Sequence, residues 1–103
     1  MEIETTYKLL KLIEGTPDIS QRSLAKKMNV SLGKVNYCLQ ALKEKGWVKA
    51  KNFKNSENKK GYIYVLTPKG ASERARVTAR FLKRKLTEYD EIKREIEELR
   101  REV

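Results

Sequence analysis

The feature of the sequence that most constrains its fold is a pair of short amphipathic helices joined by a tight turn. Ser20 can cap the first helix, which ends at Asn29, a residue that tolerates the left-handed backbone of such a turn. Ser31 can cap the second helix, which runs to about Lys45 and is closed by Gly46. Two helices separated by so few residues predict a helix-turn-helix.

The sizes of the side chains along this pair fit the packing of a helix-turn-helix. Ala25 is small at the place where the two helices approach each other closely. The other apolar positions supply a core between the helices: Leu24, Met28, Val30, Val35, Cys38, Leu39 and Leu42. We expect Cys38 to act as a small buried hydrophobe, with redox sensing as the alternative role.

The remaining elements follow from periodicity and from turn residues. Apolar residues at helical spacing predict a helix over residues 3–13, which Gly15 and Pro17 stop. Alternation predicts strands over residues 47–53 and 62–66, with a mobile loop over residues 54–60 between them. Thr67-Pro68 then begins a long charged helix. The chain is thus predicted to be mainly α with a small β-hairpin.

The charge of the chain is unevenly distributed. Lys and Arg number 24 against 14 Asp and Glu, which gives a net charge of +10 and a pI near 9.8. Residues 1–70 carry a net charge of +8 and residues 71–87 carry +5, whereas residues 88–103 carry −3. A basic body with a separate acidic tail favours a polyanionic partner, and we expect double-stranded DNA.

The second helix of the pair, about residues 31–45, is the candidate recognition helix. If its apolar stripe points inward, the residues that face outward or toward its beginning are Ser31, Leu32, Gly33, Lys34, Asn36, Tyr37 and Gln40. Asn and Gln can pair with adenine in the major groove, and Lys can reach guanine or a phosphate. The alternative is an ordinary solvated helix face.

The hairpin, about residues 47–66, is the candidate wing. Its lysines are interleaved with Asn and Ser near the tip: Lys49, Lys51, Lys54, Lys59 and Lys60. Such a basic tip can lie along phosphates or in the minor groove. The alternative role of these lysines is to prevent the edge strand from pairing with other chains, and both roles can hold together.

These elements, in this order, resemble the MarR family of bacterial winged-helix regulators. The resemblance covers about residues 3–80 and depends on Gly46-Trp47-Val48 entering a basic hairpin and on Leu66-Thr67-Pro68-Lys69-Gly70 following a strand. More narrowly, the chain is similar to the small regulators associated with exopolysaccharide gene clusters. The resemblance implies a dimeric winged helix-turn-helix that binds DNA and regulates transcription.

The sequence departs from this family in two respects. Typical members carry a further N-terminal helix, which this sequence does not supply, and an Asp/Arg-rich wing, whereas this wing is built from Lys, Asn and Ser. We therefore assign no small-molecule effector to the chain. We divide it into a winged helix-turn-helix domain over residues 1–70 and a C-terminal dimerisation helix over residues 71–103.

Apolar residues recur at coiled-coil spacing along the C-terminal helix: Leu82, Leu86, Tyr89, Ile92, Ile96, Leu99 and Val103. We refer to these seven residues as the seam. A second copy of the chain can cover the seam, and packing back onto the same domain is the alternative. The spacing shortens beside Thr87, where a capping box is possible, so the helix is either kinked or broken there. The basic residues that precede Thr87 can face either DNA or solvent, and we expect solvent for most of them: Arg74, Arg76, Arg80, Lys83, Arg84 and Lys85.

Other function classes find little support in the sequence. There is no histidine, no glycine-rich phosphate loop and no nucleophile beside a base, so we expect no enzyme activity, cofactor or metal. No apolar run is long enough to span a membrane, and the N-terminus is unlike a signal peptide, which predicts a soluble, cytoplasmic protein. The main rival is a winged helix that binds another protein, with RNA binding behind it.

Overall fold

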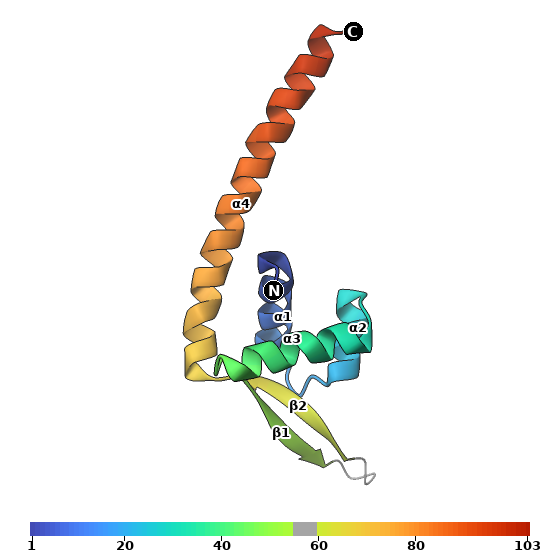
Figure 1. The fold of residues 1–103 in the computed structure, drawn as a ribbon, viewed down its shortest axis with the longest axis vertical. Coiled ribbons are helices and arrows are strands. Elements are labelled where there is room, and N and C mark those ends of the chain that lie inside the picture. Colours follow the sequence, from blue (N-terminus) through green and yellow to red (C-terminus); the bar gives the residue numbers. More distant parts are fainter. Residues whose placement is uncertain (55–59) are drawn as a thin grey trace.

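The structure, a computed structural model, describes residues 1–54 and 60–103 and is a winged helix-turn-helix with a long C-terminal helix (Figure 1). Its elements follow the predicted order: α1 Ile3–Gly15, α2 Gln21–Met28, α3 Leu32–Glu44, β1 Val48–Lys54, β2 Lys60–Leu66 and α4 Pro68–Arg101. The prediction of a mainly helical chain with one β-hairpin is therefore confirmed.

Local signals set the ends of the helix-turn-helix as expected. The hydroxyls of Ser20 and Ser31 each accept a hydrogen bond, from the Ser23 and Lys34 amides respectively, both at 3.1 Å. Asn29 ends α2 in the left-handed region at φ 55°, and Gly46 follows α3 at φ 75°. These caps satisfy backbone groups that a helix end would otherwise leave unpaired.

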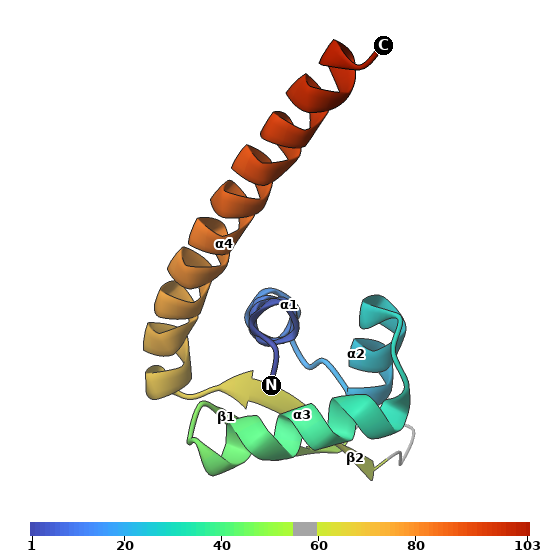
Figure 2. The same cartoon turned by 45° about the horizontal axis from the view of Figure 1, so that its top comes forward.

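The core lies where α1, α2 and α3 meet the inner face of the hairpin. Figure 2 looks nearly along α1 and shows α2, α3 and α4 arranged around it. Leu9, Leu24 and Leu39, one from each of the first three helices, are fully buried, and each such side chain contributes about 1.5–3 kcal/mol through burial. Val77 of α4 belongs to the same core, so the first turns of α4 pack with the body.

The hairpin presents alternate faces to the core and to solvent. Val48 pairs with Leu66 and Ala50 with Tyr64, and these positions turn inward. β2 also pairs with the segment before α2, because the Tyr64 amide donates to the Ile19 carbonyl at 3.2 Å. The strands run to Lys54 and from Lys60, two residues that we had predicted to lie in the loop, so that prediction was wrong at its ends. Its middle, residues 55–59, lies outside the described part.

The start of α4 is fastened to the end of α3 by the Thr-Pro-Lys-Gly motif. The Thr67 hydroxyl accepts from the Gly70 amide at 3.0 Å and donates to the Gly46 carbonyl, while the Thr67 amide donates to the Trp47 carbonyl at 3.0 Å. Gly70 lies so close to Trp47 that a Cβ on Gly70 would fall 1.9 Å from the Trp47 carbonyl oxygen. This contact requires glycine at residue 70.

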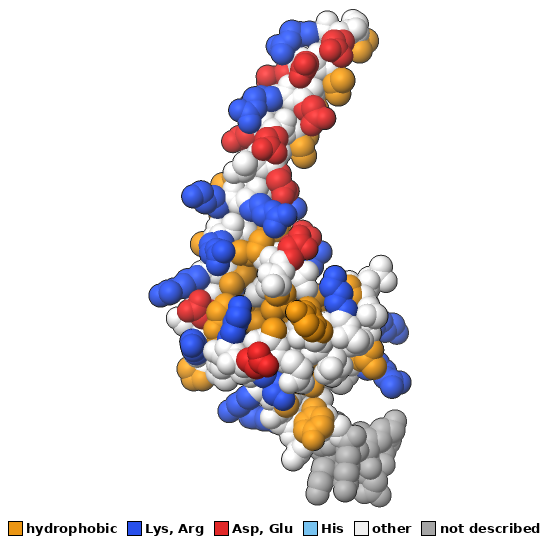
Figure 3. Space-filling view, in the orientation of Figure 1, with side chains coloured by type: hydrophobic (Ala, Val, Ile, Leu, Met, Phe, Trp, Pro, Cys, Tyr) orange, Lys and Arg blue, Asp and Glu red, His pale blue; other side chains and the backbone are white. Residues whose placement is uncertain are grey.

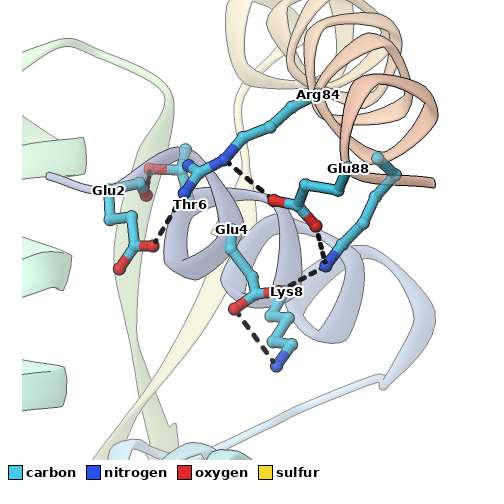
Figure 4. A network of polar contacts seen from close by, with 7 residues as sticks. Glu2, Glu4, Thr6, Lys8, Arg84 and Glu88 are labelled. Atoms are coloured by element: carbon cyan, nitrogen blue, oxygen red, sulfur yellow. Dashed lines mark hydrogen bonds and ion pairs between the residues drawn. The ribbon is translucent and has the colours of Figure 1, made fainter. Parts of the chain in front are cut away.

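Charged side chains hold α4 against α1 (Figure 4). Arg84 pairs with Glu2 at 3.7 Å and Lys85 with Glu4 at 3.6 Å, and both also pair with Glu88 on their own helix. The hydrogen bond to Glu88 raises the pKa of Lys85 and so favours its charged form. The Arg84 and Lys85 side chains stay about half exposed, so the expected exposure of most of that basic stretch is confirmed, while their charged ends also reach α1.

The aromatic rings of Tyr7 and Phe81 pack between α1 and α4 with their centroids 4.9 Å apart. A further ion pair, Arg74 with Glu14 at 3.5 Å, joins the other end of α1 to α4. Exposed ion pairs contribute little to stability, so the apolar and aromatic contacts carry most of this interface. The charges mainly fix how α1 and α4 lie against each other.

Beyond this interface α4 projects from the body without interruption, and the molecule measures 64 × 27 × 20 Å. The Thr87 hydroxyl donates to the Lys83 carbonyl within the helix at 3.2 Å and caps nothing, so of the two alternatives left open at Thr87 the break is excluded. All seven seam residues are exposed, which also excludes the alternative that the seam packs onto its own domain. Among the described residues, no helix is long and apolar enough to cross a bilayer.

Candidate nucleic-acid interface

The fold positions α3 by burying one stripe of it and leaving the opposite face open. Val35, Cys38, Leu39 and Leu42 form the buried stripe, and each is at most 4% exposed. Cys38 is therefore a core side chain, as expected from its place on the stripe. Because helix geometry places the positions between these four on the outside, the stripe determines which side chains face solvent.

All seven residues predicted for the recognition face are exposed. Gly33, Tyr37 and Gln40 lie opposite the buried stripe, and Tyr37 is 72% exposed although it is aromatic. Asn36 and Leu32 flank them on one side. Lys34 lies at the other edge, near Thr5 of α1 and Val30 of the turn. The structure thus gathers Gly33, Asn36, Tyr37 and Gln40 on one face and sets Lys34 apart from it.

The outward side chains of α3 are not engaged elsewhere in the molecule. Within the described part of the chain, Asn36, Tyr37 and Gln40 have no side-chain hydrogen bond or ion pair. Ser31 differs from them, because its hydroxyl is occupied by the cap of α3. Donors and acceptors that are held on a rigid helix and directed into solvent are available to a partner.

Gly33 has no structural role that the described residues reveal. A Cβ built on it would meet no atom within 4 Å, and its backbone is not in the left-handed region. Glycine inside a helix costs about 0.5–1 kcal/mol relative to alanine, so the fold alone gives no reason to keep it there. A glycine in the first turn of α3 does allow a partner to approach the backbone closely.

Gln21 is a positioning residue that the sequence did not reveal. Its amide nitrogen donates to the Leu32 carbonyl in the first turn of α3, and its amide oxygen accepts from the Tyr64 hydroxyl of β2, both at 3.3 Å. Burial raises the pKa of the Tyr64 hydroxyl, which keeps it protonated as a donor. Gln21 thereby links the start of α3 to the wing.

The wing residues fall into two groups. Lys49 and Lys51 are exposed on the solvent side of β1, opposite Val65 and Ile63 in the strand register. Lys54 and Lys60 pair with each other at the ends of the two strands, where the structure describes the backbone. Lys59 lies outside the described residues. Figure 1 shows the hairpin extending from the body beneath α3, so helix and wing belong to the same end of the molecule.

The seam has no part in this surface. Its residues lie on α4, which leaves the body on the side away from the wing (Figure 1). The basic helix-and-wing end and the apolar and acidic tail are therefore separate in space as well as in sequence. Each can meet a different partner without excluding the other.

Comparison with known proteins agrees with this geometry. The model of a family described as winged helix-turn-helix DNA-binding matches residues 4–49, from α1 to the beginning of β1. No curated protein sequence matches the chain. The matched stretch includes all seven residues of the recognition face, together with Lys49 of the wing.

Several solved structures share the fold. A PadR-like transcriptional regulator from Bacillus cereus superposes with a TM-score of 0.74 at 18% identity, over 82% of this chain and 87% of that one. FabT from Streptococcus pneumoniae, solved in complex with DNA, gives 0.61 at 23% identity over 88% and 61%.

MarR from E. coli, in its apo form, has a TM-score of 0.60 at 30% identity over 70% of this chain and 52% of that one. This chain thus spans most of the PadR-like protein but only 61% of FabT and 52% of MarR. The narrower resemblance to exopolysaccharide-associated regulators stays a prediction. The chain is a winged helix-turn-helix protein with the fold of the MarR and PadR transcriptional regulators.

Proposed function

We propose that the chain is a homodimeric transcriptional regulator that binds double-stranded DNA in a sequence-specific way. The observation that carries this proposal is the exposed, unengaged polar face of α3 at the basic end of the molecule. FabT, which has a similar fold, was solved in complex with DNA. We expect the protein to act in the cytoplasm and to have no enzyme activity.

In this proposal α3 enters the major groove with its N-terminal half. Asn36 and Gln40 are one turn apart on the helix and each can form paired hydrogen bonds with an adenine. Gly33 lets the backbone approach the groove wall, while Lys34, at the edge of the face, meets a phosphate or a guanine. Tyr37 stands between these positions and offers both a ring and a hydroxyl.

The wing serves to position the protein on the duplex. Lys49 and Lys51 face solvent on β1, and the sequence continues this run of positive charge with Lys54, Lys59 and Lys60. Phosphate contacts by lysine fix register and orientation but carry no base information. We therefore assign sequence reading to α3 and backbone or minor-groove contact to the wing.

The homodimer would bring two recognition helices to one duplex. A two-fold axis predicts an inverted-repeat operator whose half-sites lie about one helical turn, roughly 34–36 Å, apart. The exposed seam of α4 supplies an apolar surface with which a second copy can pair. Dimerisation thus doubles the base contacts that one α3 can make.

Alanine variants should separate the two roles. Asn36→Ala or Gln40→Ala should cost about 1–3 kcal/mol on the preferred duplex and little on a scrambled one. Lys49→Ala or Lys51→Ala should weaken binding to both duplexes and lower the salt slope by about one for each lost phosphate contact. Fluorescence titration of each variant on both duplexes measures these differences.

Lys69→Ala is a suitable control, since Lys69 is exposed in the first turn of α4, beyond both the recognition face and the hairpin. It removes the same charge and should leave the affinity for both duplexes and the salt slope close to those of the wild type. Equal losses on both duplexes for the α3 variants would show that α3 does not read sequence. Salt-insensitive duplex binding, together with retained binding to a protein partner, would favour the protein-interaction alternative.

A further inference from the structure

The part of α4 beyond Glu88 stands away from the body and has an apolar side that no other described residue covers. Figure 3 shows hydrophobic side chains along one edge of this projecting part, with charged side chains over much of the rest of the face in view. Tyr89, Ile92 and Leu99 are each more than half exposed, and Ile96 is 44% exposed. A stripe of this kind at heptad spacing needs an apolar surface to cover it.

The residue types on the stripe fit a two-stranded coiled coil of parallel helices. Counting from Tyr89, the a positions are Tyr89, Ile96 and Val103, and the d positions are Ile92 and Leu99. β-Branched residues at a combined with Leu at d favour two parallel strands. Ile96 and Leu99 follow this pattern in the last turns of the helix, whereas Val103 lies just beyond the end of α4 at Arg101.

The charged residues beside the stripe indicate how the two helices of a dimer are oriented. Lys93 and Arg100 occupy the e positions, whereas Glu88, Glu95 and Glu102 occupy the g positions. Parallel helices bring each g residue to the e residue five positions later on the partner, which places Glu opposite Lys or Arg. Antiparallel helices bring g to g and e to e, which places like charges together. The pattern therefore favours the parallel arrangement.

These charges are also free to act between chains. Among the described residues, no ion pair reaches beyond Glu88, so Lys93, Glu95 and Arg100 have no partner within the chain. Closer to the body, Leu82 and Leu86 continue the exposed stripe, while Phe81 and Lys85 turn toward α1. The stripe thus runs past the α1 contact and is not blocked by it.

We propose that two copies of the chain associate through a parallel, in-register coiled coil of α4 over residues 89–101, in which Glu95 of each copy pairs with Arg100 of the other. This inference rests on the homodimer of the proposed function and adds its orientation. A parallel pair places both winged helices at the same end of the rod, where the two α3 helices can meet one duplex. An antiparallel pair would place them at opposite ends.

Charge reversal in the full-length protein tests the orientation. Glu95→Lys alone and Arg100→Glu alone each set like charges against each other in both symmetric pairs of a parallel dimer. Each should weaken dimerisation by about tenfold in sedimentation equilibrium at low salt. The double variant, or an equimolar mixture of the two single variants, restores opposite charges and should restore wild-type affinity. Arg101→Glu, on the outer face, is the matched control and should have little effect.

Disulfide formation gives a second measurement of the same arrangement. Val103→Cys should cross-link under mild oxidation, because the two C-terminal ends, just beyond Arg101, lie side by side in a parallel, in-register pair. Arg101→Cys, which points outward, should not cross-link. Cys38 is buried in the core of each copy and should take no part in the reaction.

The outcomes distinguish this inference from the proposed function. Single reversals that strengthen the dimer, with no cross-link through residue 103, would overturn the parallel orientation and leave the homodimer in place. A wild-type chain that is monomeric at micromolar concentration would overturn both the orientation and the homodimer. Duplex binding is measured separately, so DNA recognition by α3 can stand or fail independently of either result.

Discussion

Raising the salt concentration from about 50 to 200 mM should weaken binding of the protein to duplex DNA by roughly 10³–10⁵-fold. This range assumes a dimer that makes about 6–10 phosphate contacts, each of which releases condensed counterions from the duplex. The residues of the helix-turn-helix and wing carry a net charge of +8, and those at the start of α4 carry +5. The acidic tail projects away from this end, so it does not offset the attraction there.

The measurement is the slope of log affinity against log salt concentration on one duplex. A steep linear fall would show that lysine–phosphate contacts dominate the affinity. An affinity that is flat with salt would contradict the assignment of the basic body and wing to a DNA backbone. A chain truncated before Thr87 lacks most of the seam and should be monomeric. Its slope should be about half as steep if each copy of the dimer supplies half of the phosphate contacts.

Replacing Gly70 by alanine should strongly destabilise the fold, although the change adds only one methyl group. The added Cβ would lie 1.9 Å from the Trp47 carbonyl oxygen and 2.8 Å from its carbonyl carbon, both of which are backbone atoms. Neither can move aside without disturbing the Thr67 hydrogen bonds that fasten α4 to the end of α3. We expect a loss of about 3 kcal/mol or more and a fall in Tm of more than about 10 °C.

Gly33→Ala is the matched control, because it makes the same chemical change inside another helix. A Cβ at Gly33 meets no atom within 4 Å, so the variant should be as stable as the wild type or more stable by up to about 1 kcal/mol. It should nevertheless bind duplex DNA less well, if α3 approaches the groove there. Equal thermal stability of the Gly70 and Gly33 variants would show that α4 is not fastened at Trp47 as described.

Most of the fold could be predicted because its signals are local. Ser20, Ser31 and Thr67 cap helices through contacts with amides three residues away, and such contacts are visible in the sequence. The left-handed turn at Asn29 is likewise set by a single residue type. The recognition face followed from these ends together with helix periodicity, which is why all seven predicted residues are exposed.

Contacts between residues distant in sequence were not predictable in the same way. Gln21 reaches Leu32 and Tyr64, and Lys85 reaches Glu4, only because the folded chain brings these elements together. No local pattern in the sequence distinguishes Gln21 from another glutamine, or Lys85 from its basic neighbours. At Thr87 a local signal was present but had no effect on the structure. The capping pattern there indicated a possible helix start, but the surrounding helix formers kept α4 continuous.

The central claim is that α3 reads base sequence, and the most direct test is a comparison of two duplexes with the wild-type protein. A duplex selected from a random pool and a scrambled duplex of equal length and composition are titrated at the same salt concentration. The account predicts an inverted repeat in the selected duplex and an affinity for it at least about 10³-fold higher than for the scrambled one. Equal affinity for the two duplexes, with no sequence enriched by selection, would contradict it.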